Sequence, residues 1–279
     1  MPDETLSNVI VIPQNDAELL RQTLREEEVA AVILEPTGAS WGSLPLDPAI
    51  LPLLREETRA AGALLIFYEV ITGFRVSPGG VQAATGITPD LTTLAKILAG
   101  GLPGGAVAGR RDVLSLIEFS GAARSDFGGR VPHPGTFNAN PLSAAAGSAA
   151  LAAVATGKPN AAASELCLSL VRQLNAELAQ AGIPGCAYGQ ASMFHIILGA
   201  ECPPTIDGFE WNWGGHPGHK MPQMSLDVFW GLRRGMLNEG VDLMGGGGML
   251  SAVHTQDDIS FTIQAFRQTL AAMKADSLL

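Results

Sequence analysis

The run Ala63-Leu-Leu-Ile-Phe-Tyr-Glu-Val70 is nearly continuous in apolar residues, and it decides how the fold is interpreted. An apolar run of this length without polar alternation is typical of a strand buried on both faces of a parallel sheet. An earlier run, Val29-Ala-Ala-Val-Ile-Leu-Glu35, has the same character and stops before Pro36. The two runs therefore predict two neighbouring strands.

A helix is expected between these strands. Asp47 and Pro48 supply an N-cap and a first-turn proline. The pattern is amphipathic through Arg59, and Gly62 stands where a helix C-cap belongs. Strand, helix and strand together describe a right-handed parallel βαβ unit.

The rest of the chain continues this alternation and then changes character. The further predicted elements are a strand at 91–96, a glycine-rich turn at 100–105, an apolar stretch at 106–108, a helix from Asn140-Pro141 to about 154, a helix at roughly 161–181, a strand at 194–198 and two later helices. This order predicts an α/β fold over residues 1–157, with a mostly parallel sheet and helices on both faces. Residues 158–279 are expected to form a smaller α+β domain.

Composition narrows the classes of function. The formal net charge is -10, which argues against nucleic acid or an anionic membrane as a partner, because both attract basic proteins. No apolar stretch is long enough to cross a bilayer, and Met1 to Ser7 does not resemble a signal peptide. Cys167, Cys186 and Cys202 lack CxxC spacing and favour a reducing compartment over a disulfide framework. We expect a cytoplasmic protein that acts on a small molecule.

Lys96 is the residue most suited to chemistry. It ends a predicted buried strand just before the glycine turn, where an ordinary surface lysine is not expected. An amine shielded from water is more readily unprotonated and nucleophilic. Spacing alone is equally compatible with a lysine that extends from the strand end into solvent.

Several motifs around Lys96 carry a resemblance that covers about residues 29–150. They are Leu34-Glu35-Pro36, Gly62-Ala-Leu-Leu-Ile-Phe-Tyr-Glu-Val-Ile-Thr-Gly-Phe-Arg75, Thr88-Pro-Asp-Leu-Thr-Thr-Leu-Ala-Lys96, Gly100-Gly-Leu-Pro103 and His133-Pro-Gly-Thr-Phe-Asn-Ala-Asn-Pro141. A weaker match lies near the C-terminal end, at Leu250-Ser-Ala-Val-His-Thr255. With these motifs the sequence resembles class III pyridoxal-phosphate (PLP) aminotransferases, most of all glutamate-1-semialdehyde 2,1-aminomutases. The resemblance implies a fold type I PLP-transferase.

The resemblance also implies roles for individual residues. Lys96 would form the Schiff base with PLP, and Val70 would pack on the pyridine ring. Thr136 would reach the cofactor phosphate of a neighbouring subunit, which implies a homodimer. A threonine hydroxyl beside glycine is a reasonable phosphate donor, although it is also an ordinary turn residue.

The sequence departs from the family pattern in two places. The family has an aspartate at position 68, whose carboxylate pairs with the protonated ring nitrogen and makes PLP an electron sink. Tyr68 stands there instead, and a neutral phenol cannot supply that charge. The family also carries a long segment before the position of Val29, with a phosphate-binding loop on a helix N-terminus and a stacking aromatic residue. We expect the cofactor phosphate to lack this anchor.

These departures leave two alternatives to an impaired aminotransferase or aminomutase. In the first, a Tyr68/Lys96 pair acts as a general base in a cofactor-independent ester or lactam hydrolase, because an ammonium beside a phenol favours the phenolate. Thr93 or a nearby serine would be the nucleophile, although Thr93 and Lys96 would project from opposite faces of one strand. In the second, the chain is a non-catalytic dimerising remnant. His216 and His219 do not complete a metal site, and no metal is expected.

Overall fold

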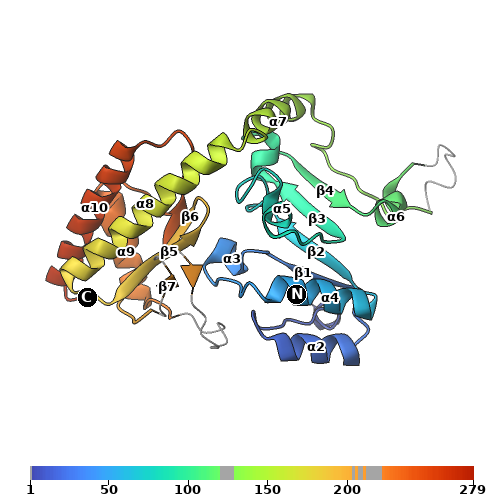
Figure 1. The fold of residues 1–279 in the computed structure, drawn as a ribbon, viewed down its shortest axis with the longest axis horizontal. Coiled ribbons are helices and arrows are strands. Elements are labelled where there is room, and N and C mark those ends of the chain that lie inside the picture. Colours follow the sequence, from blue (N-terminus) through green and yellow to red (C-terminus); the bar gives the residue numbers. More distant parts are fainter. Residues whose placement is uncertain (1, 120–128, 203–204, 207–209, 212–221) are drawn as a thin grey trace.

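The computed structural model describes residues 2–119, 129–202, 205–206, 210–211 and 222–279. It divides into an N-terminal part around one sheet and a C-terminal part around another, joined by the helices α7 and α8 (Figure 1). The N-terminal sheet has the strand order β1-β2-β3-β4, and the C-terminal sheet has the order β5-β6-β9. The predicted boundary at residue 157 stays a prediction.

The N-terminal part contains four strands with short and medium helices between them. Its elements are α1 (Asp3–Leu6), α2 (Ala17–Glu26), β1 (Ala31–Leu34), α3 (Ala39–Gly42), α4 (Ile50–Ala61), β2 (Leu64–Glu69), α5 (Gly80–Thr85), β3 (Leu91–Ala95), the 3₁₀ helix η1 (Lys96–Ala99), β4 (Gly105–Gly109), α6 (Arg111–Leu114), the 3₁₀ helix η2 (Ser115–Ile117) and α7 (Pro141–Val154). β1 pairs with β2 and β2 with β3 in parallel, while β4 runs antiparallel to β3. The mostly parallel sheet is thus confirmed.

Local signals in the sequence set the helix ends. Gly62 adopts φ +73°, the left-handed conformation that a glycine C-cap allows, and ends α4 as predicted. The Asn140 side chain accepts hydrogen bonds from the backbone N–H groups of Leu142 and Ser143 at 3.0 and 3.1 Å, so α7 begins at Pro141 as predicted. α4 begins at Ile50, later than expected, and the Asp47 carboxylate accepts a hydrogen bond from the N–H of Ala49 in the turn before the helix.

The two faces of the N-terminal sheet differ in burial. Leu65 and Phe67 of β2 are fully buried in a cluster that includes residues from α2, α4 and α5. On the opposite face Ile33 is 59% exposed, and Tyr68 and Val107 are each 40% exposed. The expectation that β2 is buried on both faces is therefore wrong, since its side chains alternate between a covered face and an open one.

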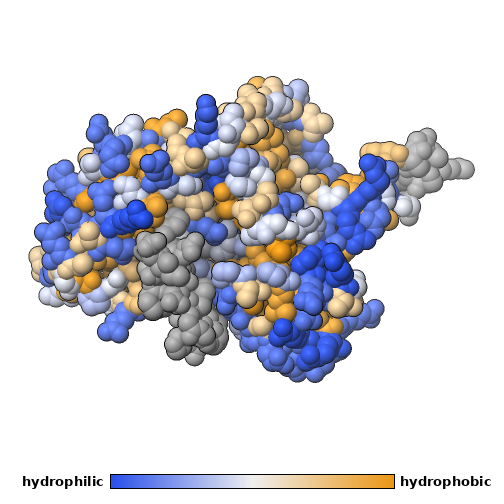
Figure 2. Space-filling model, in the orientation of Figure 1, coloured by the Kyte–Doolittle hydropathy of each residue, from blue (hydrophilic) through white to orange (hydrophobic). Residues whose placement is uncertain are grey.

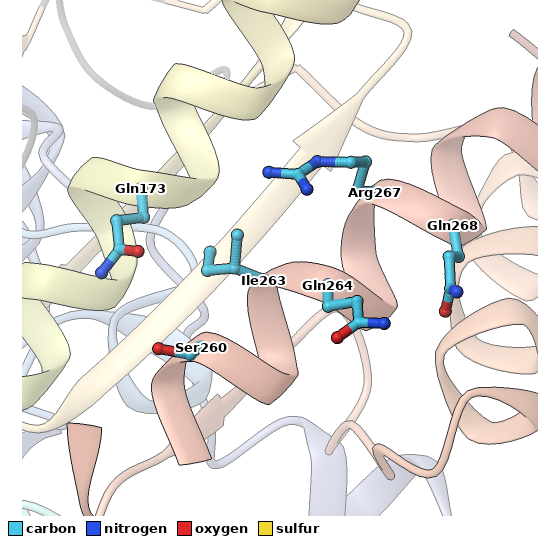
Figure 3. A pocket seen from close by; sticks show the side chains of 6 residues that line it. All are labelled: Gln173, Ser260, Ile263, Gln264, Arg267 and Gln268. Atoms are coloured by element: carbon cyan, nitrogen blue, oxygen red, sulfur yellow. The ribbon is translucent and has the colours of Figure 1, made fainter. Parts of the chain in front are cut away.

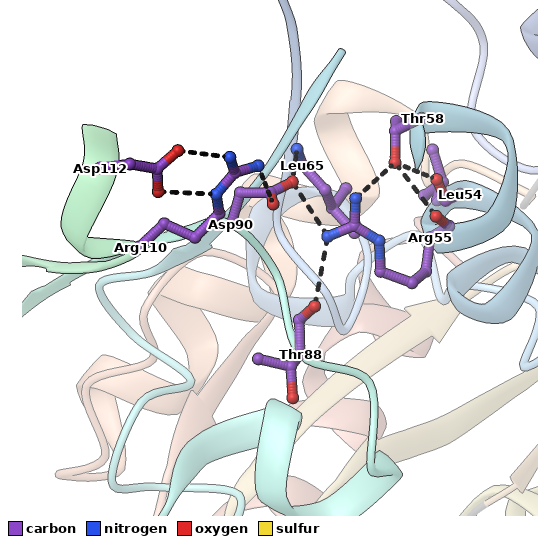
Figure 4. Close-up of polar contacts among 8 residues, drawn as sticks. All are labelled: Leu54, Arg55, Thr58, Leu65, Thr88, Asp90, Arg110 and Asp112. Carbon is purple, nitrogen blue, oxygen red and sulfur yellow. Dashed lines mark hydrogen bonds and ion pairs between the residues drawn. The ribbon is translucent and has the colours of Figure 1, made fainter. Parts of the chain in front are cut away.

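The buried carboxylate of Asp90 links four elements through hydrogen bonds and ion pairs at the start of β3. Asp90 accepts a hydrogen bond from the N–H of Leu65 in β2 at 2.8 Å and lies 2.9 Å from a guanidinium nitrogen of Arg55 on α4 (Figure 4). Arg110, which follows β4, approaches the other oxygen at 3.1 Å and also pairs with the exposed Asp112. Burial opposes ionisation of Asp90, but the donors from Leu65 and the two arginines outweigh it and lower its pKa.

The C-terminal part packs three long helices against its sheet. Its elements are α8 (Lys158–Ala181), β5 (Gly185–Gln190), β6 (Met193–Leu198), β7 (Thr205–Ile206), β8 (Glu210–Trp211), α9 (Leu226–Asn238), β9 (Gly247–Met249) and α10 (Gln256–Ala275). β6 is buried along its whole length, and its core neighbours come from α8, α9 and α10. The predicted helices and central strand are present, with α8 starting earlier than expected. Among the described residues, no helix is both long and apolar enough to cross a bilayer.

The cysteine pairing corrects a prediction. Cys186 on β5 and Cys202, four residues after β6, form a disulfide, whereas Cys167 on α8 is a free, buried thiol. The sequence interpretation favoured no disulfide because the cysteines have no characteristic spacing. β5 and the segment after β6 meet only through the fold of the C-terminal sheet, which spacing does not reveal.

Candidate functional site

The candidate residues gather at the carboxyl ends of β2 and β3, as the parallel pairing requires. Tyr68 on β2 lies opposite Thr93 on β3 in the sheet register. Val70 follows directly after β2, and Lys96 follows directly after β3. Strand ends of this kind are the usual ligand edge of an open parallel sheet.

Lys96 is held in a strained backbone conformation. Its φ is +51°, a left-handed value that costs a non-glycine residue roughly 1–2 kcal/mol. The strain persists because η1 packs closely on α7: a Cβ on Gly147 would lie 2.4 Å from the carbonyl oxygen of Leu98, and one on Gly100 would lie 2.5 Å from that of Ala146. Strained residues of this kind are concentrated at functional sites.

The Lys96 side chain is exposed in the single chain. The expectation that its amine is kept away from water is therefore wrong for this form of the protein. The physical reason is that the open face of the sheet carries no covering element beside Tyr68 and Val107 among the described residues. Lys96 nevertheless stands where predicted, at the strand end next to the Tyr68 strand.

Thr93 does not suit the nucleophile role that was considered for it. Its hydroxyl oxygen is buried and has no hydrogen-bond partner in the described structure. A nucleophile has to reach its substrate, and a hydroxyl oxygen that is buried cannot. Tyr68, its cross-strand neighbour, is the exposed polar group of this pair.

Two carboxylates near the strand ends, those of Glu69 and Glu35, accept hydrogen bonds from backbone N–H groups instead of facing a ligand. Glu69 is fully buried and accepts hydrogen bonds from the N–H of Val81 at 2.7 Å and the hydroxyl of Thr72 at 3.3 Å. Burial raises the pKa of Glu69, partly offset by these donors. Glu35 accepts from the N–H groups of Ser40 and Trp41 at 3.1 and 2.7 Å. Both carboxylates therefore shape the loops that follow their strands.

The sequence interpretation missed an aromatic contact between the two parts of the molecule. Ser40 and Trp41 both have left-handed φ values, +50° and +51°, and their turn projects the Trp41 ring toward β6. The ring centroids of Trp41 and His195 are 4.0 Å apart, and Nε2 of His195 donates to the Trp41 carbonyl oxygen at 3.3 Å. The hydroxyl of Tyr188 donates to the carbonyl oxygen of Ser43 at 2.7 Å. Residues more than 140 positions apart meet here, which no local pattern could indicate.

His195 predicts a loss of stability in mild acid. Burial lowers its pKa from 6.5 to about 4, opposed by the hydrogen bond to Trp41. The folded state therefore favours the neutral ring, so this contribution is complete above pH 6.5 and is lost as the pH falls toward 4. We expect roughly 3 kcal/mol of the free energy of unfolding to disappear across this range. Urea unfolding of the wild type and His195→Gln measures it, and equal pH slopes in the two proteins would contradict the assignment.

Other predicted positions lie apart from the strand ends or outside the described residues. Thr136 is exposed in a turn before α7 and has no hydrogen bond among the described residues, so its role toward another subunit stays a prediction. His216 and His219 lie outside the described residues. A surface cavity of about 470 Å³ lies between α8 and α10 in the C-terminal part, bordered by amide side chains and Arg267 (Figure 3). It belongs to a different part of the fold from Lys96.

Residues 6–193 match the family model described as aminotransferase class-III. The chain belongs to the class III aminotransferase family. It is 42% identical over 200 residues to a glutamate-1-semialdehyde 2,1-aminomutase of Pyrobaculum aerophilum, an alignment covering 71% of this chain and 45% of that relative. The predicted family is thus confirmed, and the chain spans less than half the length of the curated relatives it matches.

Solved structures of a transaminase and an aminotransferase share the fold. An omega-transaminase from Sphaerobacter thermophilus superposes with a TM-score of 0.83 at 31% identity, covering 97% of this chain and 58% of the transaminase. A beta-phenylalanine aminotransferase from Variovorax paradoxus gives a TM-score of 0.75 at 30% identity, with 95% and 58% coverage. The fold type I PLP-transferase architecture is therefore confirmed.

The residues of this class III chain fit one requirement of PLP and not another. Lys96 offers an exposed amine at the strand end, and Val70 is an apolar neighbour for a flat ring. Tyr68, however, offers a hydroxyl at the position where the family resemblance implies a carboxylate for the ring nitrogen. The residues fit attachment of the cofactor through Lys96 and do not fit its activation.

Proposed function

We propose that this chain is a PLP-binding relative of class III aminotransferases and aminomutases, with Lys96 as the attachment residue and weak amino transfer. The observation that supports it is the placement of Lys96. An exposed amine stands on a strained turn that α7 fixes beside the ligand edge of the sheet. A free surface lysine has no need of such a turn, whereas a lysine that must meet an aldehyde at a fixed place does.

Lys96 and Tyr68 have separate tasks in this proposal. PLP, when bound, supplies an electron sink for the carbon next to the amine of the substrate. The Lys96 amine would hold the cofactor through its aldehyde and would be placed to carry a proton at its Nζ. The hydroxyl of Tyr68 can donate a hydrogen bond at the ring edge, but it cannot balance a positive charge there. Turnover is therefore limited by Tyr68.

A homodimer is part of the same proposal. α7 is apolar around its whole circumference, yet most of its residues are exposed in the single chain. Figure 2 shows largely apolar surface where α7 lies in Figure 1. A helix that is apolar on all sides is normally buried, so a covering partner is expected. A second copy would satisfy this expectation and bring Thr136 toward the neighbouring site.

The decisive experiment is covalent trapping of the cofactor aldehyde on Lys96. Purified protein mixed with PLP should develop the absorption band of a lysine imine, and borohydride followed by peptide mass mapping should find the pyridoxyl group on Lys96. Lys96→Ala should abolish both signals, because no other amine stands at the strand ends among the described residues.

Lys158 supplies the matched control, since it is also an exposed lysine and begins α8 instead of following a strand of the sheet. Lys158→Ala should leave the band and the label on Lys96 unchanged. Absence of the band in the wild type, or equal labelling of Lys96 and Lys158, would reject the proposal.

A further inference from the structure

The disulfide of the C-terminal part lies in the layer that contacts the Trp41 turn. Cys186 and Tyr188 are two residues apart on β5 and form an apolar cluster with Ile197, against which Cys202 and Met224 pack. Tyr188 pairs with His195 in the sheet register, and these two side chains contact the loop around Trp41. The disulfide therefore attaches the segment that follows β6 to β5. It does so on the face of the sheet that contacts the N-terminal part of the molecule.

The two sulfur-bearing residues differ in accessibility. Cys186 is buried, with 7% of its surface exposed, because it lies within β5. Cys202 is only partly buried, at the end of the described segment that follows β6. Cys202 is thus the more exposed residue of the pair, and its sulfur is the expected point of attack for an external thiolate. Disulfide exchange depends on access to the attacked sulfur.

We propose that the Cys186–Cys202 disulfide is a redox-active site that a dithiol opens by attack on Cys202. One thiolate of the reductant bonds to Sγ of Cys202, the bond between the two cysteines breaks, and the Cys186 thiolate leaves and takes up a proton. The second thiol of the reductant then attacks the mixed disulfide, releases Cys202 and closes the reductant's own disulfide. The protein gains two electrons and two protons, which the dithiol loses.

Opening this site changes the layer beside the Trp41 turn. The disulfide closes a loop with a sequence separation of 16 residues, so its loss restores freedom to that loop in the unfolded chain. In the folded state it releases Cys202 and its segment from the cluster around Tyr188. Reduction is therefore expected to lower the midpoint of thermal unfolding by roughly 5–10 °C.

Alkylation under native conditions tests the proposal, with dithiothreitol as the probe. The untreated protein should show no labelled Cys186 or Cys202, and the treated protein should show both labelled by peptide mapping. Cys167 is an internal control, because it is fully buried and burial raises the pKa of its thiol to about 12. It should stay unlabelled throughout. Reduced thioredoxin, in a parallel arm, shows whether a protein dithiol reaches the same bond.

Single variants identify the attacked sulfur. In Cys186→Ser the free Cys202 should react with iodoacetamide at least about tenfold faster than the free Cys186 of Cys202→Ser, since reaction follows exposure. Three results would overturn the proposal: label on Cys186 and Cys202 before any reductant is added, reduction only when Cys167 becomes labelled at the same rate, or equal reactivity in the two variants. The second result would mean that the bond opens only when the chain unfolds.

Discussion

Tyr68→Asp should raise the rate of amino transfer by on the order of 10²-fold, because it places a carboxylate where the positive ring nitrogen of the cofactor needs a partner. Tyr68 is 40% exposed on the open face of the sheet, so the change removes little packing. The measurement is the rate of amino exchange between an amino acid donor and a keto acid acceptor, with added PLP, in the wild type and the variant.

Tyr68→Asn is the matched control, since asparagine has the shape of aspartate without its charge. It should leave the rate near that of the wild type. A similar gain in both variants would show that the bulk of the tyrosine limits the rate, not its lack of charge. No gain in Tyr68→Asp, although the Lys96 label still forms, would contradict the role assigned to position 68.

The sheet could be predicted from the sequence because its signals are local. Apolar runs gave β1 and β2, and Gly62 and Asn140 marked helix ends through conformations and hydrogen bonds that depend on a few neighbouring residues. The placement of Tyr68 and Lys96 at one edge followed from parallel pairing alone. These features can be predicted because they depend on residues that are neighbours in the sequence and on the general rule that parallel strands end at the same edge of a sheet.

The environment of the site could not be predicted in the same way. The exposure of Lys96 and Tyr68 depends on what covers the open face, and an apolar strand pattern does not state which face is covered. The strained Lys96 turn depends on close approach between Leu98 and Gly147, which are far apart in sequence. The contact of Trp41 with His195 depends likewise on how the two parts pack.

Asp90→Ala should lower the free energy of unfolding by about 3–5 kcal/mol, because it leaves two arginines without a buried counter-charge. Arg55 is the more affected, since only 15% of its side chain is exposed and it would keep only weak hydrogen bonds, to Thr88 and Thr58 at 3.3 Å. The N–H of Leu65 would also lose its acceptor. Urea unfolding of the wild type and the variant measures this loss.

Asp112→Ala gives the matched control, because Asp112 pairs with the same Arg110 but its side chain is 65% exposed. An exposed pair of this kind contributes at most about 1 kcal/mol, so the control should be close to the wild type. The lowered pKa of Asp90 adds a pH signature, since its contribution is present above its ordinary pKa of 3.8 and is lost as the pH falls below it. Equal destabilisation by the two variants would mean that burial of the Asp90 network contributes nothing. A larger loss for Asp90→Ala would show that the strands which carry Tyr68 and Lys96 are fixed from their opposite ends.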